Sequence, residues 1–217
     1  MNRQAIILAV IGLVMVGGIL ILAKTVGSNQ SQQQQQQAQA ELVRDDSARL
    51  GPEDAKVTIV EFGDYQCPAC AATAPILSRI QSEQSTDVAL VFRHFPLPMH
   101  DQAKLGAYAA ESAGALGEYW MMHDWLYAHQ NAWVEAQDPK STIADAATSF
   151  GLDRQQFLAK LDDPDIQAKV DRDLADAQAL SLTGTPTLFI NGVQYQGQLD
   201  YDSLKRAVDQ VMQEDLN

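Results

Sequence analysis

The only two cysteines of this 217-residue chain, Cys67 and Cys70, are separated by two residues and lie between two contrasting runs. Before them, residues 56–62 form a short, β-branched and almost continuously apolar run, which is typical of a central strand covered on both faces. After them, Pro68 at a first helical position introduces an alanine-rich run that predicts a helix over residues 68–84. A cysteine pair between a buried strand and a helix is the strongest constraint that the sequence places on the fold.

The rest of the chain supplies two further strand regions and a long helical region. Residues 88–95 predict a second strand, so strand, helix and strand form a right-handed parallel unit. Residues 100–182 show helical spacing and little strand signal. Residues 187–196 indicate a hairpin with an Asn-Gly turn, and residues 201–214 a closing helix. Helices inside the long region are expected near residues 101–115, 118–128, 140–150, 154–161 and 165–182. We therefore expect an α/β fold whose β-α-β and β-β-α halves are separated by an all-helical insertion.

The N-terminal part of the chain differs in composition from the rest. Residues 5–23 are uncharged and apolar, and a helix needs roughly 20 such residues to cross the hydrocarbon layer. Residues 1–27 are therefore predicted to be an uncleaved membrane anchor, with a cleaved secretory signal as the alternative. Residues 28–40 are rich in glutamine and predict a flexible linker. The folded domain is expected over residues 41–217.

The charge balance excludes one class of partner. The formal net charge of the chain is -13, and residues 1–40 contain Arg3, Lys24 and no acid, so the folded domain is more acidic still. Such a surface repels phosphate backbones and anionic headgroups. We expect no nucleic-acid partner, and we expect contact with the membrane only through the N-terminal helix.

The spacing of Cys67 and Cys70 predicts a reversible switch between dithiol and disulfide. Residues three apart on a helix share a face, so the two sulfurs can join with little backbone movement. A structural crosslink is a poor explanation, because so short a loop removes little entropy from the unfolded chain. Unpaired N–H groups at the helix start stabilise a thiolate, so Cys67 is the expected nucleophile. Cys70 should be more shielded and should resolve mixed disulfides.

The cysteine pair has two other interpretations, a zinc site and a pair of inert core thiols. A zinc site requires four ligands, but the sequence has no second cysteine pair, no HxxxH partner and only four histidines, each standing alone. We therefore expect no metal, and no cofactor beyond the redox-active disulfide itself. Two inert core thiols are the remaining alternative.

Three pieces of the sequence resemble the DsbA-like thiol-disulfide oxidoreductases of the thioredoxin superfamily, in a membrane-anchored form. They are VEFGDYQCPAC, the helical insertion, and TGTPTLFINGVQYQG, and the resemblance covers about residues 57–214. It implies a thioredoxin fold with an inserted helical subdomain. It also implies that Pro186 is a cis-proline facing the cysteines, and that the Thr185 backbone holds an extended substrate strand beside Cys67.

The resemblance also assigns roles to residues near the cysteines. Glu61 lies six residues before Cys67, where thioredoxin-fold proteins often keep a buried acid beneath the second cysteine. We expect Glu61 to be partly buried, to have a raised pKa and to pass a proton to or from Cys70; a solvated or ion-paired carboxylate is the alternative. Pro68 and Ala69 are placed with the substrate-binding residues. Strongly oxidising DsbA proteins have histidine in place of Ala69, so Cys67 is expected to be less acidic than theirs.

The function implied by the resemblance is that of a membrane-tethered dithiol oxidase. It would donate the Cys67–Cys70 disulfide to reduced, unfolded exported proteins, and a membrane quinone-linked thiol oxidase would reoxidise it. The domain is expected on the extracytoplasmic side, because an oxidising compartment suits this chemistry. A disulfide reductase or isomerase on the same fold, and a non-enzymatic chaperone or metal carrier, remain alternatives.

Three further features are interpreted as structural. The aromatic residues between 119 and 133 are expected to pack between helices, with a peptide-binding groove as the alternative. Arg93 and His94 are expected at the surface, with an approach to the cysteine site as the alternative. The acidic run over residues 162–165 is expected to end one helix and cap the next, with a calcium loop as the alternative.

Overall fold

The computed structural model describes residues 42–214 of the chain. The membrane anchor predicted for residues 1–27 and the linker predicted for residues 28–40 lie outside the described residues. Within residues 42–214, no helix has the length and apolar character needed to cross a bilayer.

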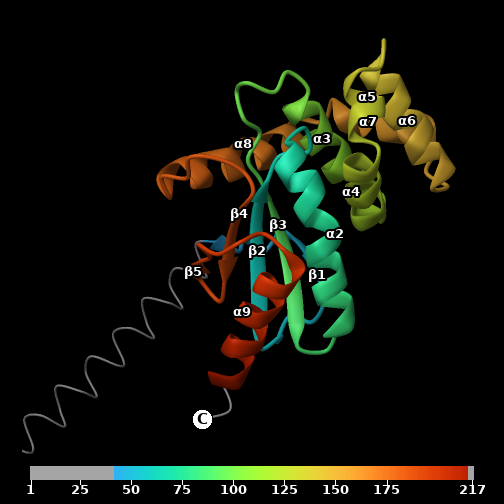
Figure 1. Cartoon of the computed structure of the whole chain (residues 1–217). Helices are drawn as coiled ribbons and strands as arrows, with labels where there is room; N and C mark the ends of the chain where they lie inside the picture. The colour runs from blue at the N-terminus through green and yellow to red at the C-terminus, as the bar shows by residue number, and fades with distance from the viewer. Residues whose placement is uncertain (1–41, 215–217) are drawn as a thin grey trace, which may run out of the picture. The chain divides into compact units, whose positions relative to one another are not determined.

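Five strands form one mixed sheet in the order β1-β3-β2-β4-β5 (Figure 1). They are β1 (Ala48–Leu50), β2 (Val57–Gly63), β3 (Val88–His94), β4 (Thr187–Ile190) and β5 (Val193–Gln194). β2 and β3 are parallel and every residue in both is buried, as their continuous apolar runs predicted. β1 and β4 pair antiparallel with β3 and β2, respectively. The predicted mixed α/β architecture is confirmed, but β1 was missed.

Helices cover both faces of this sheet (Figure 1). α2 (Pro68–Glu83) and α9 (Tyr201–Glu214) pack on one face, where Leu77 and Leu204 join Ile59 of β2 in a buried cluster. α8 (Pro164–Ala179) packs on the other face, where Ala177 contacts the cluster that contains Phe62. Side chains alternate between the two faces along β2. Residues at odd positions of β2, Glu61 among them, therefore point toward α2.

The helical insertion is built as predicted, with one additional short helix. Its helices are α3 (Ala103–Gly114), α4 (Tyr119–Ala128), α5 (Gln130–Val134), α6 (Pro139–Ser149), α7 (Arg154–Leu161) and α8. α5 is the helix that the sequence pattern did not predict. Trp133 and Met122 are fully buried, which confirms packing for part of the aromatic region, although Met121 is 48% exposed. Asp163 caps α8 by accepting a hydrogen bond from the Asp165 N–H, as predicted for the acidic run.

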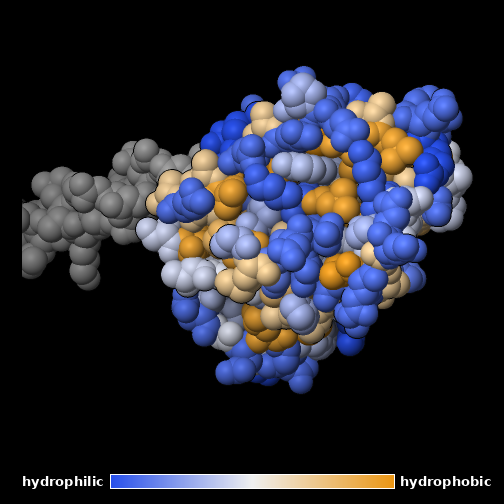
Figure 2. Space-filling view, turned by 90° about the horizontal axis from the view of Figure 1, so that it is seen from above, coloured by the Kyte–Doolittle hydropathy of each residue, from blue (hydrophilic) through white to orange (hydrophobic). Residues whose placement is uncertain are grey.

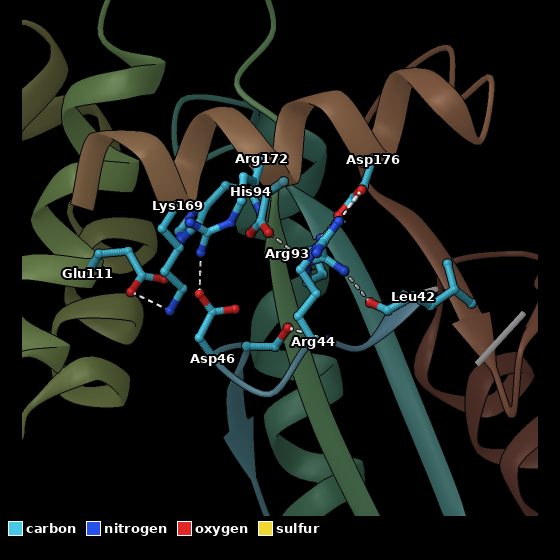
Figure 3. Close-up of polar contacts among 11 residues, drawn as sticks. Leu42, Arg44, Asp46, Arg93, His94, Glu111, Lys169, Arg172 and Asp176 are labelled. Atoms are coloured by element: carbon cyan, nitrogen blue, oxygen red, sulfur yellow. Dashed lines mark hydrogen bonds and ion pairs between the residues drawn. The ribbon is translucent and has the colours of Figure 1, made fainter. Parts of the chain in front are cut away.

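The prediction that Arg93 and His94 lie at the surface is wrong. Both are buried at the end of β3. The Arg93 guanidinium donates to Asp173 over 2.8 Å, pairs with Asp176 and donates to the Leu42 carbonyl (Figure 3). The second carboxylate oxygen of Asp173 accepts the His94 N–H over 2.9 Å. A guanidinium can be buried here because carboxylate oxygens of α8 and a carbonyl oxygen of the N-terminal segment compensate for its lost hydration.

The same cluster of charges fastens the N-terminal segment to α8. Arg44 donates two hydrogen bonds to the Asp176 carboxylate, at 2.6 and 2.7 Å, and Arg172 pairs with Asp46 (Figure 3). These pairs are partly exposed, so each contributes less than the buried Arg93 pair. Arg93 is therefore the centre of the contact between β3, α8 and the segment that leads into β1.

Removing the charge of Asp173 should destabilise the fold strongly. Asp173→Asn leaves the buried Arg93 guanidinium without the more deeply buried of its two carboxylate partners and places an amide against groups that are donors. We expect a loss of about 3 kcal/mol in the free energy of unfolding, measured by urea denaturation followed by circular dichroism. In the control Asp171→Asn, the lost partner is the exposed Lys104, so the loss should stay below about 1 kcal/mol. Equal, small losses in both variants would contradict the proposed importance of the buried pair.

Candidate active site

The cysteine pair lies at the N-terminus of α2, as predicted. Cys67 is the N-cap residue, with an extended backbone at φ -77° and ψ 122°, and Pro68 follows at the first helical position. Cys70, one turn inside the helix, is fully buried, whereas Cys67 keeps 7% of its surface exposed. Both are free thiols in the structure. Residues 42–214 contain no group of three or more His, Cys, Asp or Glu side chains that could hold a metal ion.

The surroundings of Cys67 favour its thiolate and lower its pKa from 9.0 to about 5. The largest cause is a hydrogen bond from the Cys70 thiol; burial opposes it, and the Thr185 side chain and the backbone N–H groups of Cys70 and Ala69 add further donors. Burial raises the pKa of Cys70 far above its ordinary value, and its bond to Cys67 adds to the shift. Cys67 is thus acidic without a histidine at position 69, because the sulfur collects donors from its own helix and from Thr185.

The loop before β4 faces the cysteine pair. The Thr185–Pro186 peptide bond is cis, which confirms the conformation expected from the resemblance. The Cys67 Sγ lies 3.4 Å from the Thr185 carbonyl oxygen, to which the thiol donates. Pro68 and Ala69, which follow Cys67 at the start of α2, are exposed. Of the residues predicted to contact or face a substrate, Thr185 is thus the one that contacts the Cys67 sulfur across the fold.

Glu61 lies beneath the pair in a fully buried position. Its exposed fraction is 0%, and neither carboxylate oxygen has a hydrogen-bond partner among the described residues. Burial, followed by the charge of Cys67, raises the pKa of Glu61 from 4.5 to about 8. The Glu61 charge in turn raises the pKa of Cys70. The predicted raised pKa is confirmed, the burial is complete rather than partial, and the solvated or ion-paired alternative is wrong. Proton transfer by Glu61 remains a prediction.

Asp64, which the sequence interpretation missed, holds the turn that leads into Cys67. Its buried carboxylate accepts the N–H groups of Gln66 and Leu97, each over 2.8 Å, and lies 2.7 Å from His100 Nδ1. Leu97 and His100 come from the loop between β3 and α3. The position of Asp64 three residues before Cys67 was a usable signal, but two of its partners, Leu97 and His100, lie 33 and 36 residues away in the sequence.

Gln130 of α5 was also missed, and it contacts the same turn from the helical insertion. Its side-chain Nε2 donates to the carbonyl oxygens of Tyr65, over 2.8 Å, and of Cys67, over 3.1 Å. The Gln66 side chain accepts the backbone N–H of Gln102 over 2.7 Å. The insertion therefore fixes the backbone of the nucleophile. Nothing in the local sequence around Gln130 indicates this role.

Comparison with known proteins shows which family the chain belongs to. A family model described as Thioredoxin matches residues 43–210, and the chain belongs to this family. Among curated proteins, an Na(+)/H(+) antiporter NhaA 1 of Salinispora arenicola is 36% identical over 159 residues. Another, from Mycolicibacterium gilvum, is 35% identical over 162 residues. These matches cover 73% of this chain but only 24% and 25% of the antiporters, so the chain spans about a quarter of the length of these relatives.

Solved structures with this fold include DsbA-like thiol-disulfide oxidoreductases. A thioredoxin-like oxidoreductase from Silicibacter pomeroyi is 26% identical with a TM-score of 0.67, covering 78% of this chain and 94% of that one. DsbA2 of Pseudomonas aeruginosa is 26% identical with a TM-score of 0.64, covering 81% and 100%. BdbD of Bacillus subtilis is 25% identical with a TM-score of 0.64, covering 77% and 93%. The chain is similar to these proteins and shares their thioredoxin-like fold.

The reduced protein should show a thiolate that persists in acid. Because the pKa of Cys67 is lowered to about 5, ultraviolet thiolate absorbance and the rate of alkylation should both fall to half near pH 5 rather than near pH 9. Cys67→Ser should abolish the signal. Cys70→Ala should move the midpoint to higher pH, because it removes the largest stabilising hydrogen bond. A midpoint near pH 9 in the wild-type protein would contradict this account of the site.

Glu61 should make stability depend on pH in the neutral range. A folded pKa of about 8 against 4.5 means that ionisation opposes folding, so stability is present in full below pH 4.5 and is lost as pH rises through 8. In the oxidised protein, Glu61→Gln should remove this loss. The difference in the free energy of unfolding between Glu61→Gln and wild type should therefore grow by about 4 kcal/mol as the pH rises from 4.5 through 8. Urea denaturation from pH 4 to 9 measures the difference. A constant difference between the two proteins would show that the pKa of Glu61 is unshifted.

Proposed function

We propose that the chain is a dithiol oxidase that transfers its Cys67–Cys70 disulfide to reduced client proteins. The observation that carries this proposal is the acidic thiol of Cys67, held at the start of α2 above a buried Cys70 and opposite Thr185. Stabilising the Cys67 thiolate stabilises the reduced form of the pair. The disulfide is consequently easier to reduce, which favours donation of the disulfide to clients.

The transfer proceeds in two exchanges. A client thiolate attacks the Cys67 sulfur of the disulfide, which forms a client–Cys67 bond and releases the Cys70 sulfur as a thiolate. A second client thiolate then attacks the client sulfur of the mixed disulfide and displaces Cys67. The client loses two electrons and gains a disulfide, and the cysteine pair gains the two electrons. Cys67 is the better leaving group in the second exchange because its pKa is the lower of the pair.

Glu61 supplies the proton that the first exchange requires. With a pKa of about 8 it carries a proton at neutral pH, and the released Cys70 thiolate is strongly basic in its buried position. Protonation of Cys70 by Glu61 prevents Cys70 from re-forming the internal disulfide. During reoxidation the direction reverses, and the Glu61 carboxylate accepts the Cys70 proton. The burial of both groups on the face of β2 that α2 covers supports this role.

The surface around the cysteines suits unfolded clients. Figure 2 shows the end of the molecule at which β2 and β3 finish, where hydrophobic residues form several separate patches among hydrophilic ones. Met99, in the loop that Asp64 holds, is 74% exposed. Exposed apolar side chains such as Met99 offer contacts to the apolar segments that an unfolded client exposes.

The proposal also includes the location of the domain and the partner that reoxidises its cysteine pair. A membrane anchor over residues 1–27 would hold the domain on the extracytoplasmic side, where exported proteins are unfolded and disulfides persist. A membrane quinone-linked thiol oxidase would restore the disulfide. The antiport named for the curated relatives belongs to those whole proteins and forms no part of the proposal.

The direction of catalysis is tested by the redox equilibrium of the pair. Equilibration of the full chain with glutathione should give a potential well above that of thioredoxin, roughly -270 mV, and the oxidised protein should form disulfides in a reduced, unfolded substrate. Cys67→Ser should abolish that activity. Glu61→Gln should slow it and flatten its pH profile near pH 8. A potential as low as that of thioredoxin would favour the reductase alternative, and activity that survives Cys67→Ser would favour a chaperone.

A further inference from the structure

A pocket lies beside the cysteine pair, at the contact between α2 and the helical insertion. It has a volume of about 400 Å³ and is lined by Ala71 of α2 and by the junction of α4 and α5, from Tyr127 to Ala132. This volume is within the range of ordinary small-ligand sites. None of the residues predicted to face a substrate, Pro186 and Thr185 among them, lines it.

Two of the lining residues hold the backbone of the nucleophile. The Ala71 N–H and the Gln130 side-chain Nε2 each donate to the Cys67 carbonyl oxygen, both over 3.1 Å. The pocket therefore adjoins the main chain of Cys67, whereas Thr185 faces its sulfur at 3.4 Å. The N-terminal end of α2 lies between β4 and the α4–α5 region (Figure 1). A chain bonded to Cys67 thus has the Thr185 loop on one side and the pocket on the other.

The chemistry of the lining fits a short piece of uncharged peptide. The side chains of Ala71, Ala128 and Ala132 contribute methyl groups to the wall. Gln130 donates both of its amide hydrogens, to Tyr65 and Cys67, which leaves its Oε1 as the acceptor of that side chain. A peptide main chain offers N–H donors at regular intervals, and an apolar side chain gains free energy by leaving water for an alanine surface.

We propose that this pocket is a second client subsite, which receives a residue flanking the client cysteine that is bonded to Cys67. An uncharged apolar side chain packs against the three alanines, and a client backbone N–H donates to Gln130 Oε1. This inference rests on the proposed oxidase function and deepens it. The Thr185 loop and the pocket then hold the client chain on both sides of its cysteine, which selects for extended and unfolded segments.

The test compares a peptide with a thiol that has no flanking chain. Oxidised full-length protein is mixed with a peptide whose single cysteine lies between two leucines, or with dithiothreitol, and the two rates of disulfide opening are measured. Ala132→Phe fills the pocket from an exposed position of α5 and should lower the ratio of the peptide rate to the dithiothreitol rate by about tenfold. Ala175→Phe, exposed on α8, is the matched control and should leave the ratio unchanged.

A second peptide keeps the result independent of the stability of the variant. Replacing both leucines by glycine should slow the reaction of the wild-type protein by a similar factor and should cause no further loss in Ala132→Phe. A wild-type protein that reacts equally fast with both peptides, or an unchanged ratio in Ala132→Phe, overturns the subsite and leaves the oxidase function standing. Failure of the wild-type disulfide to react with either thiol overturns the oxidase function itself.

Discussion

The N-terminus of α2 is the feature on which the chemistry of this protein depends. The first N–H groups of any helix have no helical acceptors, and here those of Ala69 and Cys70 converge on the Cys67 sulfur. That geometry requires β2 to end at the point where α2 begins, and it requires the turn between them to be rigid. Asp64 and Gln130 meet the second requirement, Asp64 by accepting backbone N–H groups and Gln130 by donating to carbonyl oxygens.

Two buried ionisable side chains near the sheet, Arg93 and Glu61, have opposite surroundings. Arg93 is surrounded by oxygens from α8 and the N-terminal segment, so its charge is retained and fastens those elements together. Glu61 has no such partner, so its burial disfavours the carboxylate and keeps the proton bound near neutral pH. A compensating cation beside Glu61 would stabilise the fold but would lower the pKa of Glu61 and remove a proton donor from beneath Cys70. The unpaired state of Glu61 is therefore what its proposed role requires.

The parts of the structure that could be predicted are those with a local signal. β2, α2 and β3 follow from the apolar and alanine-rich runs on either side of the cysteines, and the acidity of Cys67 follows from its place at a helix start. β1 has only three partly buried residues, and its strand character comes from pairing with β3. The burial of Arg93 depends on Asp173, 80 residues further along the chain. The role of Gln130 depends on Cys67, 63 residues before it. Sequence periodicity does not reveal hydrogen bonds between side chains that lie this far apart in the chain.

The thioredoxin-like half of the domain and the helical insertion contribute to the active site in different ways. The strength of Cys67 as a thiolate comes mainly from α2 and Thr185, which the thioredoxin-like half provides. The insertion adds little to that acidity, but it places Gln130 and the exposed alanines next to the Cys67 main chain. If the pocket is a client subsite as proposed, substitutions on the exposed surface of α5 change which client segments fit beside Cys67 while the donors that set its pKa remain in place. The proposal therefore makes selection of clients and reactivity of the thiol physically separable in this fold.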